Sequence, residues 1–146
     1  MAMKRFLTIL ALSLLPALAQ AQGNSAQFGR FEVLYSVVNT TFVEPDVAAT
    51  YNMVRARDRA FVNIAVLETL EDGSQRGVSA KIQGRSWDLF QNTFLEFTEV
   101  REGDAIYYIA DFEFSDKEVR FFNLQLLPEG EKRSVELKFQ QKVYEQ

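Results

Sequence analysis

The chain has 146 residues, of which 47% are apolar, and its 16 basic and 20 acidic residues give a formal charge of −4. It contains neither cysteine nor histidine. Without cysteine there are no disulfides, thiol nucleophiles or iron–sulfur clusters, and without histidine the commonest general base and the commonest transition-metal ligand are missing. Ser–His catalysis and histidine-based zinc or copper sites are therefore excluded, and we expect no cofactor.

The N-terminus predicts export. Lys4 and Arg5 precede an uncharged apolar run at 6–15, and two Ala-x-Ala cleavage sites follow, ending at Ala19 and Ala21. This pattern is typical of a signal peptide, and the run is too short to span a hydrocarbon core of about 30 Å. We expect cleavage after Ala21, with cleavage after Ala19 as an alternative and an uncleaved membrane anchor as the less favoured one.

The remaining chain, 22–146, has the length of one domain. We expect a flexible polar stub at 22–27, a single domain at 28–146 and no membrane anchor after cleavage. Loss of Lys4 and Arg5 leaves 14 basic and 20 acidic residues, a formal charge of −6. Nucleic acids and anionic lipids are poor partners for such a chain, because both are bound by clustered basic residues.

Apolar residues alternate with period two along most of the mature chain, which predicts strands. The clearest alternation is near the C-terminus, where Val135, Leu137 and Phe139 alternate with Glu136 and Lys138. Turn sequences recur about every ten residues and indicate about seven strands. A single sheet would leave many aromatic residues without packing partners. We therefore predict an all-β, immunoglobulin-like sandwich of two antiparallel sheets, with a closed barrel as the alternative.

Two local predictions refine this fold. Residues 94–100 and 105–114 are expected to pair as a hairpin, and another strand is expected at 119–127. One short connecting helix is predicted from Pro45 to Tyr51, because proline is favoured in a first helical turn and acidic residues such as Asp46 complement the helix dipole there.

An unusual row of arginines precedes the centre of the chain. Arg55, Arg57 and Arg59 recur at period two, so they would project to the same side of an extended strand. Like charges in a row repel unless acids face them or an anion binds among them. The favoured interpretation is pairing with acids on neighbouring strands, namely Glu96, Glu99 or Asp111. The alternative is a site for an anion or an acidic partner.

Thirteen phenylalanines, five tyrosines and one tryptophan could line a cleft for a sugar or a peptide. Trp87, Tyr107 and Phe121 are the candidates, although aromatic residues in strands usually belong to the core. Asp111 and Glu113 share a predicted strand face and could hold Ca²⁺ or act as an acid/base pair. Their simpler interpretation is the solvent-exposed end of a half-buried strand.

Several segments of the mature chain are similar to a known bacterial family. They are FGRFEVLYS at 28–36, RAR at 55–57, VNI at 62–64, VREGDAIYY at 100–108 and LKFQQKVY at 137–144. Together they resemble domain of unknown function 4426, a family of small exported proteins of Gram-negative bacteria. The resemblance covers nearly all of the mature chain and implies a periplasmic location. It implies no activity and no catalytic residues.

The leading hypothesis is a non-enzymatic periplasmic sandwich that binds a protein or peptide, because catalytic side chains are missing and sheet edges can accept a strand. The predicted binding residues are Arg55, Arg57, Arg59, Asn63, Tyr107 and Phe121. One alternative is a carrier whose two sheets part to admit an apolar or anionic small molecule. A less favoured alternative is a hydrolase of cell-wall sugar that uses two carboxylates about 5 to 10 Å apart.

Overall fold

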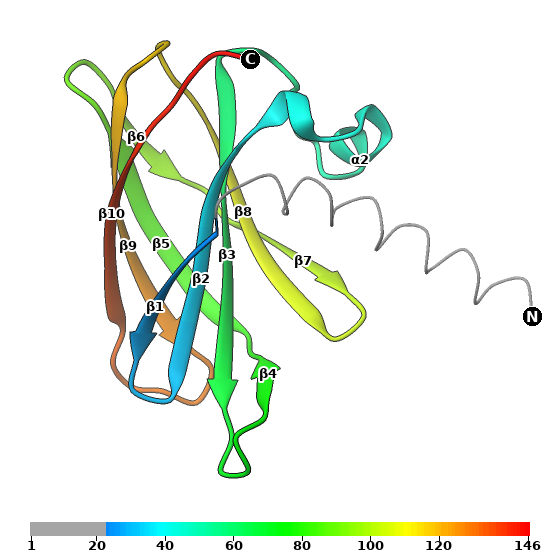
Figure 1. The fold of residues 1–146 in the computed structure, drawn as a ribbon, viewed down its shortest axis with the longest axis vertical. Coiled ribbons are helices and arrows are strands. Elements are labelled where there is room, and N and C mark those ends of the chain that lie inside the picture. Colours follow the sequence, from blue (N-terminus) through cyan, green and yellow to red (C-terminus); the bar gives the residue numbers. More distant parts are fainter. Residues whose placement is uncertain (1–22) are drawn as a thin grey trace, which may run out of the picture.

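A computed structural model describes residues 23–146, and it confirms the predicted all-β sandwich of two antiparallel sheets (Figure 1). The predicted signal peptide and both cleavage sites lie outside the described residues. The strands are β1 (Asn24–Phe28), β2 (Phe31–Asn39), β3 (Arg59–Thr69), β4 (Gln75–Gly77), β5 (Ala80–Trp87), β6 (Asn92–Leu95), β7 (Thr98–Glu102), β8 (Ala105–Glu113), β9 (Val119–Pro128) and β10 (Val135–Lys142). Among the described residues, no helix is long and apolar enough to cross a bilayer.

The two sheets enclose one hydrophobic core. The six-stranded sheet has the order β1-β2-β3-β8-β7, with β4 paired to β3, and the four-stranded sheet has the order β10-β9-β5-β6. Alternate residues point inward, as Ile64 of β3 and Leu124 of β9 do, and both have no exposed surface. Between the layers, the rings of Phe112 and Phe122 meet edge to face with centroids 5.5 Å apart. This interdigitation is the usual way in which two sheets bury their inner faces.

The structure has more strands than the seven or so expected, and one of them corrects the predicted stub at 22–27. From Asn24 onward this segment is strand β1, which pairs with β2 from Asn24 opposite Tyr35 to Phe28 opposite Phe31. Its polar side chains suit an edge strand, because one side of such a strand faces solvent. The stub prediction is therefore wrong from Asn24 onward.

The strand predicted at 94–100 is divided between the two sheets. Asn92–Leu95 forms β6 and pairs with β5, whereas Thr98–Glu102 forms β7 and pairs with β8. The two residues between them carry the chain from one sheet to the other, and Phe97 packs against the core on the way. The predicted hairpin with residues 105–114 is confirmed for β7 alone.

The predicted helix is present as α2 (Pro45–Thr50), which follows a 3₁₀ turn, η1 (Thr40–Phe42). It covers one end of the outer face of the six-stranded sheet (Figure 1). Val47 and Ala48 of the helix are buried there against Val38 and Phe61, which form a second, smaller apolar cluster. Asp46 lies in the first turn, where it complements the helix dipole.

Candidate binding surface

The outer face of the four-stranded sheet carries an aromatic cluster near its β6 edge. Trp87 of β5 lies opposite Phe121 of β9, and their rings stack with centroids 5.8 Å apart. The guanidinium of Arg85 lies 5.0 Å from the centroid of the Trp87 ring. Arg85 is in turn opposite Phe94 of β6, whose side chain is 82% exposed.

The loop between β5 and β6 adds two exposed apolar side chains to this cluster, since Leu89 is 86% and Phe90 is 81% exposed. A shallow hollow of about 280 Å³ lies between the loop and Trp87. We call Trp87, Leu89, Phe90, Phe94 and Phe121 the aromatic patch. Single exposed apolar residues are ordinary, but a group of them on one surface marks a site of interaction.

Asp88 fixes the loop that carries Leu89 and Phe90. Its Oδ1 atom accepts hydrogen bonds from the backbone N–H groups of Phe90 and Gln91, both at 2.7 Å. Its own N–H donates to the carbonyl oxygen of Gln91 at 3.0 Å. An aspartate that bonds the backbone two and three residues ahead closes a tight turn. The aspartate side chain is 1% exposed, so the turn is anchored in the protein interior while its apolar tip stays in solvent.

A buried arginine forms an ion pair with Asp88. Arg120 of β9 has no exposed surface, and its Nη1 atom donates to Oδ2 of Asp88 at 3.1 Å. Its Nε atom donates to Oγ of Ser86 at 2.8 Å, and its Nη2 atom donates to Oγ1 of Thr93 at 3.1 Å. The guanidinium also lies 5.2 Å from the centroid of the Phe112 ring. One side chain therefore connects β9, β5, β6 and the loop.

Burial acts on both charges of this pair. Burial raises the pKa of Asp88, but the two backbone N–H groups and Arg120 outweigh it, so the pKa lies below its ordinary value. Burial lowers the pKa of Arg120 more than Asp88 raises it. A guanidinium nevertheless stays protonated in proteins, so the pair is ionised at neutral pH.

The three predicted arginines do not lie along one strand. β3 begins only at Arg59, which forms ion pairs with Asp111 and, at 3.2 Å, with Glu113 on β8. The predicted pairing with Asp111 is thus confirmed for this arginine. Arg55 donates at 2.7 and 3.1 Å to two backbone carbonyls of the segment before α2, and Arg57 is exposed.

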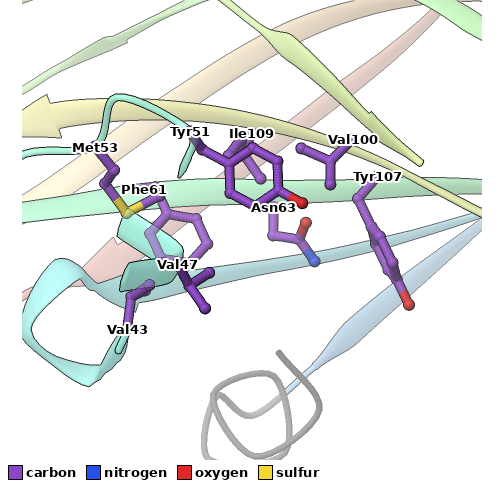
Figure 2. A pocket seen from close by; sticks show the side chains of 9 residues that line it. All are labelled: Val43, Val47, Tyr51, Met53, Phe61, Asn63, Val100, Tyr107 and Ile109. Carbon is purple, nitrogen blue, oxygen red and sulfur yellow. The ribbon is translucent and has the colours of Figure 1, made fainter. Parts of the chain in front are cut away.

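Asn63 and Tyr107 lie on the other sheet, beside α2, in a small pocket (Figure 2). Its lining is almost entirely apolar and consists of Val43, Val47, Tyr51, Met53, Phe61, Asn63, Val100, Tyr107 and Ile109. The cavity volume of about 20 Å³ suits a single water molecule. Of the six residues predicted to bind a partner, Phe121 alone belongs to the aromatic patch.

The roles of Asp88, Arg120 and the exposed tip of the loop were not predicted from the sequence. A signal for Arg120 was present, because the inward alternation of Phe122, Leu124 and Leu126 extends back to it. An arginine at an inward position requires a buried partner. No comparable signal identified that partner, since β5 and β9 are distant in the sequence.

The model of the family described as domain of unknown function DUF4426 matches residues 25–146. The chain belongs to the DUF4426 family. A crystal structure of a DUF4426 family protein from Pseudomonas aeruginosa PAO1 is 28% identical with a TM-score of 0.73, over 85% of this chain and 96% of that one. A comparison with curated proteins finds no match.

Two further solved structures share the fold of this DUF4426 chain at low identity. FetP of uropathogenic Escherichia coli strain F11, expressed in the periplasm of E. coli, is 10% identical with a TM-score of 0.60, over 86% of this chain and 96% of that one. A copper-bound variant of FetP is 8% identical with a TM-score of 0.59, over 86% and 92% of the respective chains. At this identity the likeness shows the fold alone.

Proposed function

We propose that this DUF4426 protein is a non-enzymatic binding module of the periplasm that holds a protein or peptide partner against its aromatic patch. The observation that carries the proposal is the exposure of Leu89, Phe90 and Phe94, each above 80%, around a turn fixed by a buried ion pair. Large apolar side chains dominate binding energy at interfaces. A turn that is already ordered loses little conformational entropy when a partner binds.

The periplasmic location rests on the N-terminal sequence and on the family. The signal peptide pattern predicts export, and the family resemblance noted from the sequence implies a periplasmic location. A non-enzymatic role is supported by the lack of histidine and cysteine. The carboxylates of Asp111 and Glu113, which could have formed a catalytic acid/base pair, both form ion pairs with Arg59, and this also supports a non-enzymatic role.

Two other roles have less support. The FetP variant binds copper, but this chain has no histidine or cysteine, and within residues 23–146 no group of three or more acidic residues is placed to hold a metal ion. The residues present therefore do not fit a copper site that uses histidine or thiolate ligands. A carrier has less support because the pocket beside α2 has room for one water, and the hollows of about 280 and 340 Å³ on the other sheet are shallow surface features, whereas small-molecule sites usually enclose most of the ligand.

Site-specific photo-cross-linking in cells tests the proposal. A photoreactive phenylalanine analogue replaces Phe90 or Phe94 in the exported protein, and Phe42, which is 42% exposed near α2, serves as the matched control position. We expect the same partner, identified by mass spectrometry, to be linked from positions 90 and 94 and not from 42. We also expect Leu89→Ala to weaken the adduct. If positions 90 and 94 give no adduct, or give only what 42 gives, the aromatic patch is not a binding surface.

A further inference from the structure

We propose that the segment held at the aromatic patch is an extended, acidic peptide with apolar and acidic residues on one strand face, which adds as a strand to the free edge of β6. This inference rests on the proposed function and specifies the chemistry of the partner. Three observations carry it: the open edge, the charge of the surrounding face and the shape beside Phe94.

The first observation is that β6 ends the four-stranded sheet. It pairs with β5 from Trp87 opposite Asn92 to Gly84 opposite Leu95, and no described strand pairs with its other side. An edge strand presents unpaired backbone N–H and C=O groups that an extended peptide can bond. Lysine and proline commonly block such edges, and the β6 sequence NTFL has neither.

The second observation is the charge of the outer face of the four-stranded sheet. The residues that point outward on β5 and β10 include four cations, which are Lys81, Arg85, Lys138 and Lys142. The outward positions of the four strands hold one acid, Glu136, and it is paired with Lys138 at 3.1 Å. The outward residues of β6 and β9 are uncharged.

This face is therefore positive on a chain whose overall formal charge is −4. Complementary charge accelerates association and selects the partner. A second copy of this chain packed face to face on this sheet about a two-fold axis would bring the same cations together, which is repulsive. An acidic segment is the occupant that this charge favours.

The third observation is the shape of the face beside β6. A shallow hollow of about 340 Å³ lies next to Phe94 and is lined by Arg85, Leu95 and the amides of Gln83, Asn123 and Gln125. A strand added to β6 would place alternate side chains beside Phe94, with the hollow and the guanidinium of Arg85 on the other side of that ring. An apolar side chain and an acidic one two residues apart lie on the same face of the added strand, so together they suit the ring and the guanidinium.

A peptide fits this surface better than an anionic glycan does. Sugar rings bind on free aromatic faces, but the ring of Trp87 is already in contact with Phe121 and Arg85. The most exposed side chains of the patch are those of Leu89, Phe90 and Phe94, and these can pack against apolar side chains of a peptide. The open backbone edge of β6 likewise offers a peptide a hydrogen-bonding partner that a glycan cannot match in register.

The test uses fluorescence anisotropy with the mature protein purified from the periplasm and four labelled peptides of about nine residues. In three peptides, one strand face carries valine or phenylalanine in turn with glutamate, glutamine or lysine, and the fourth is the glutamate peptide with N-methyl groups along one edge. We expect the glutamate peptide to bind at least about tenfold more tightly than the glutamine peptide, and the lysine peptide not to bind. N-methylation should abolish binding, and added salt should weaken it.

Two variants locate the binding. Arg85→Gln should lower the affinity for the glutamate peptide by about tenfold. Arg57→Gln removes an exposed arginine outside the four-stranded sheet and should leave this affinity unchanged. Equal binding of the glutamate, glutamine and lysine peptides would overturn the acidic partner, and equal binding of the N-methylated peptide would overturn strand addition. If no peptide binds while positions 90 and 94 cross-link to a glycan or a folded protein, this inference fails and a binding role for the patch stands. If positions 90 and 94 also give no cross-link, both the inference about the peptide and the proposed function are wrong.

Discussion

At the scale of single residues, the buried pair of Arg120 and Asp88 is the most consequential feature of the protein. Moving two charges out of water costs several kcal/mol for each ion, and the cost is offset only where hydrogen bonds satisfy both groups. Here Arg120 donates to Asp88, Ser86 and Thr93, and Asp88 also accepts from two backbone N–H groups. The bonds converge on the loop that carries Leu89 and Phe90. We infer that the pair orders this loop more than it raises overall stability.

The replacement Asp88→Asn should lower the free energy of unfolding by about 3 to 5 kcal/mol at neutral pH, because it leaves the charge of Arg120 buried without a counter-ion. The pKa of Asp88 in the folded protein lies below the ordinary value of 3.8. Its contribution is therefore present above about pH 4 and is lost as the pH falls through the folded value. Urea unfolding followed by the fluorescence of Trp87 measures the difference between the two proteins.

That difference should be constant from about pH 8 to pH 5 and should narrow below about pH 4. Asp58→Asn, which changes an exposed aspartate, is the matched control and should change stability by less than about 0.5 kcal/mol at any of these values. A difference for Asp88→Asn that persists unchanged to about pH 3 would show that the charge of Asp88 is not responsible.

At the scale of the elements, strands and the helix were predictable because their signals are local. The alternation along β10 and β8, and the proline and aspartate that begin α2, are read from neighbouring residues. The division of 94–100 into β6 and β7 was not predictable, since neither glycine nor proline marks the crossover at 96 and 97. Which sheet each half joins depends on partners distant in the sequence.

The candidate binding surface was unpredictable for the same reason. Phe121 was identified as a candidate from its own strand, but its stacking on Trp87 requires the pairing of β5 with β9. The prediction that the three arginines share one strand face was wrong, because Arg55 and Arg57 lie before β3 and are not part of a strand. A sequence pattern thus places side chains on a face, and only the strand order decides which faces meet.

The close approach of the paired strands β5 and β9 leads to a prediction at Gly84. A Cβ atom there would overlap the carbonyl oxygen of Asn123 and would lie 2.6 Å from Cδ2 of Leu124. Gly84→Ala should therefore lower the free energy of unfolding by about 1 to 3 kcal/mol, since β5 cannot retreat without losing its pairing with β9. The control Gly23→Ala, with nothing within 4 Å, should be neutral in the same thermal unfolding experiment. Equal effects of the two changes would contradict the close approach.

At the scale of the whole molecule, the C-terminal residues close one end of the sandwich. The N–H of Val143 donates to the carbonyl of Glu118 at 2.9 Å, and its carbonyl accepts from the N–H of Lys117 at 2.9 Å. One residue later, the carbonyl of Tyr144 accepts from Nδ2 of Asn39, which lies at the end of β2 in the other sheet, at 2.6 Å. The segment after β10 thus links the two sheets through backbone groups.

Removal of residues 143–146 should therefore destabilise the entire fold rather than fray one strand. Val143 is 3% exposed and belongs to the main core, so its loss alone should cost about 1.5 to 3 kcal/mol, and the lost hydrogen bonds add to this. The matched control is Tyr144→Ala, which keeps every backbone bond and removes a side chain that is 47% exposed. In urea unfolding we expect a single transition at lower denaturant for the truncated chain and little change for the control. A truncated chain as stable as the full one would show that the two sheets hold together without this segment.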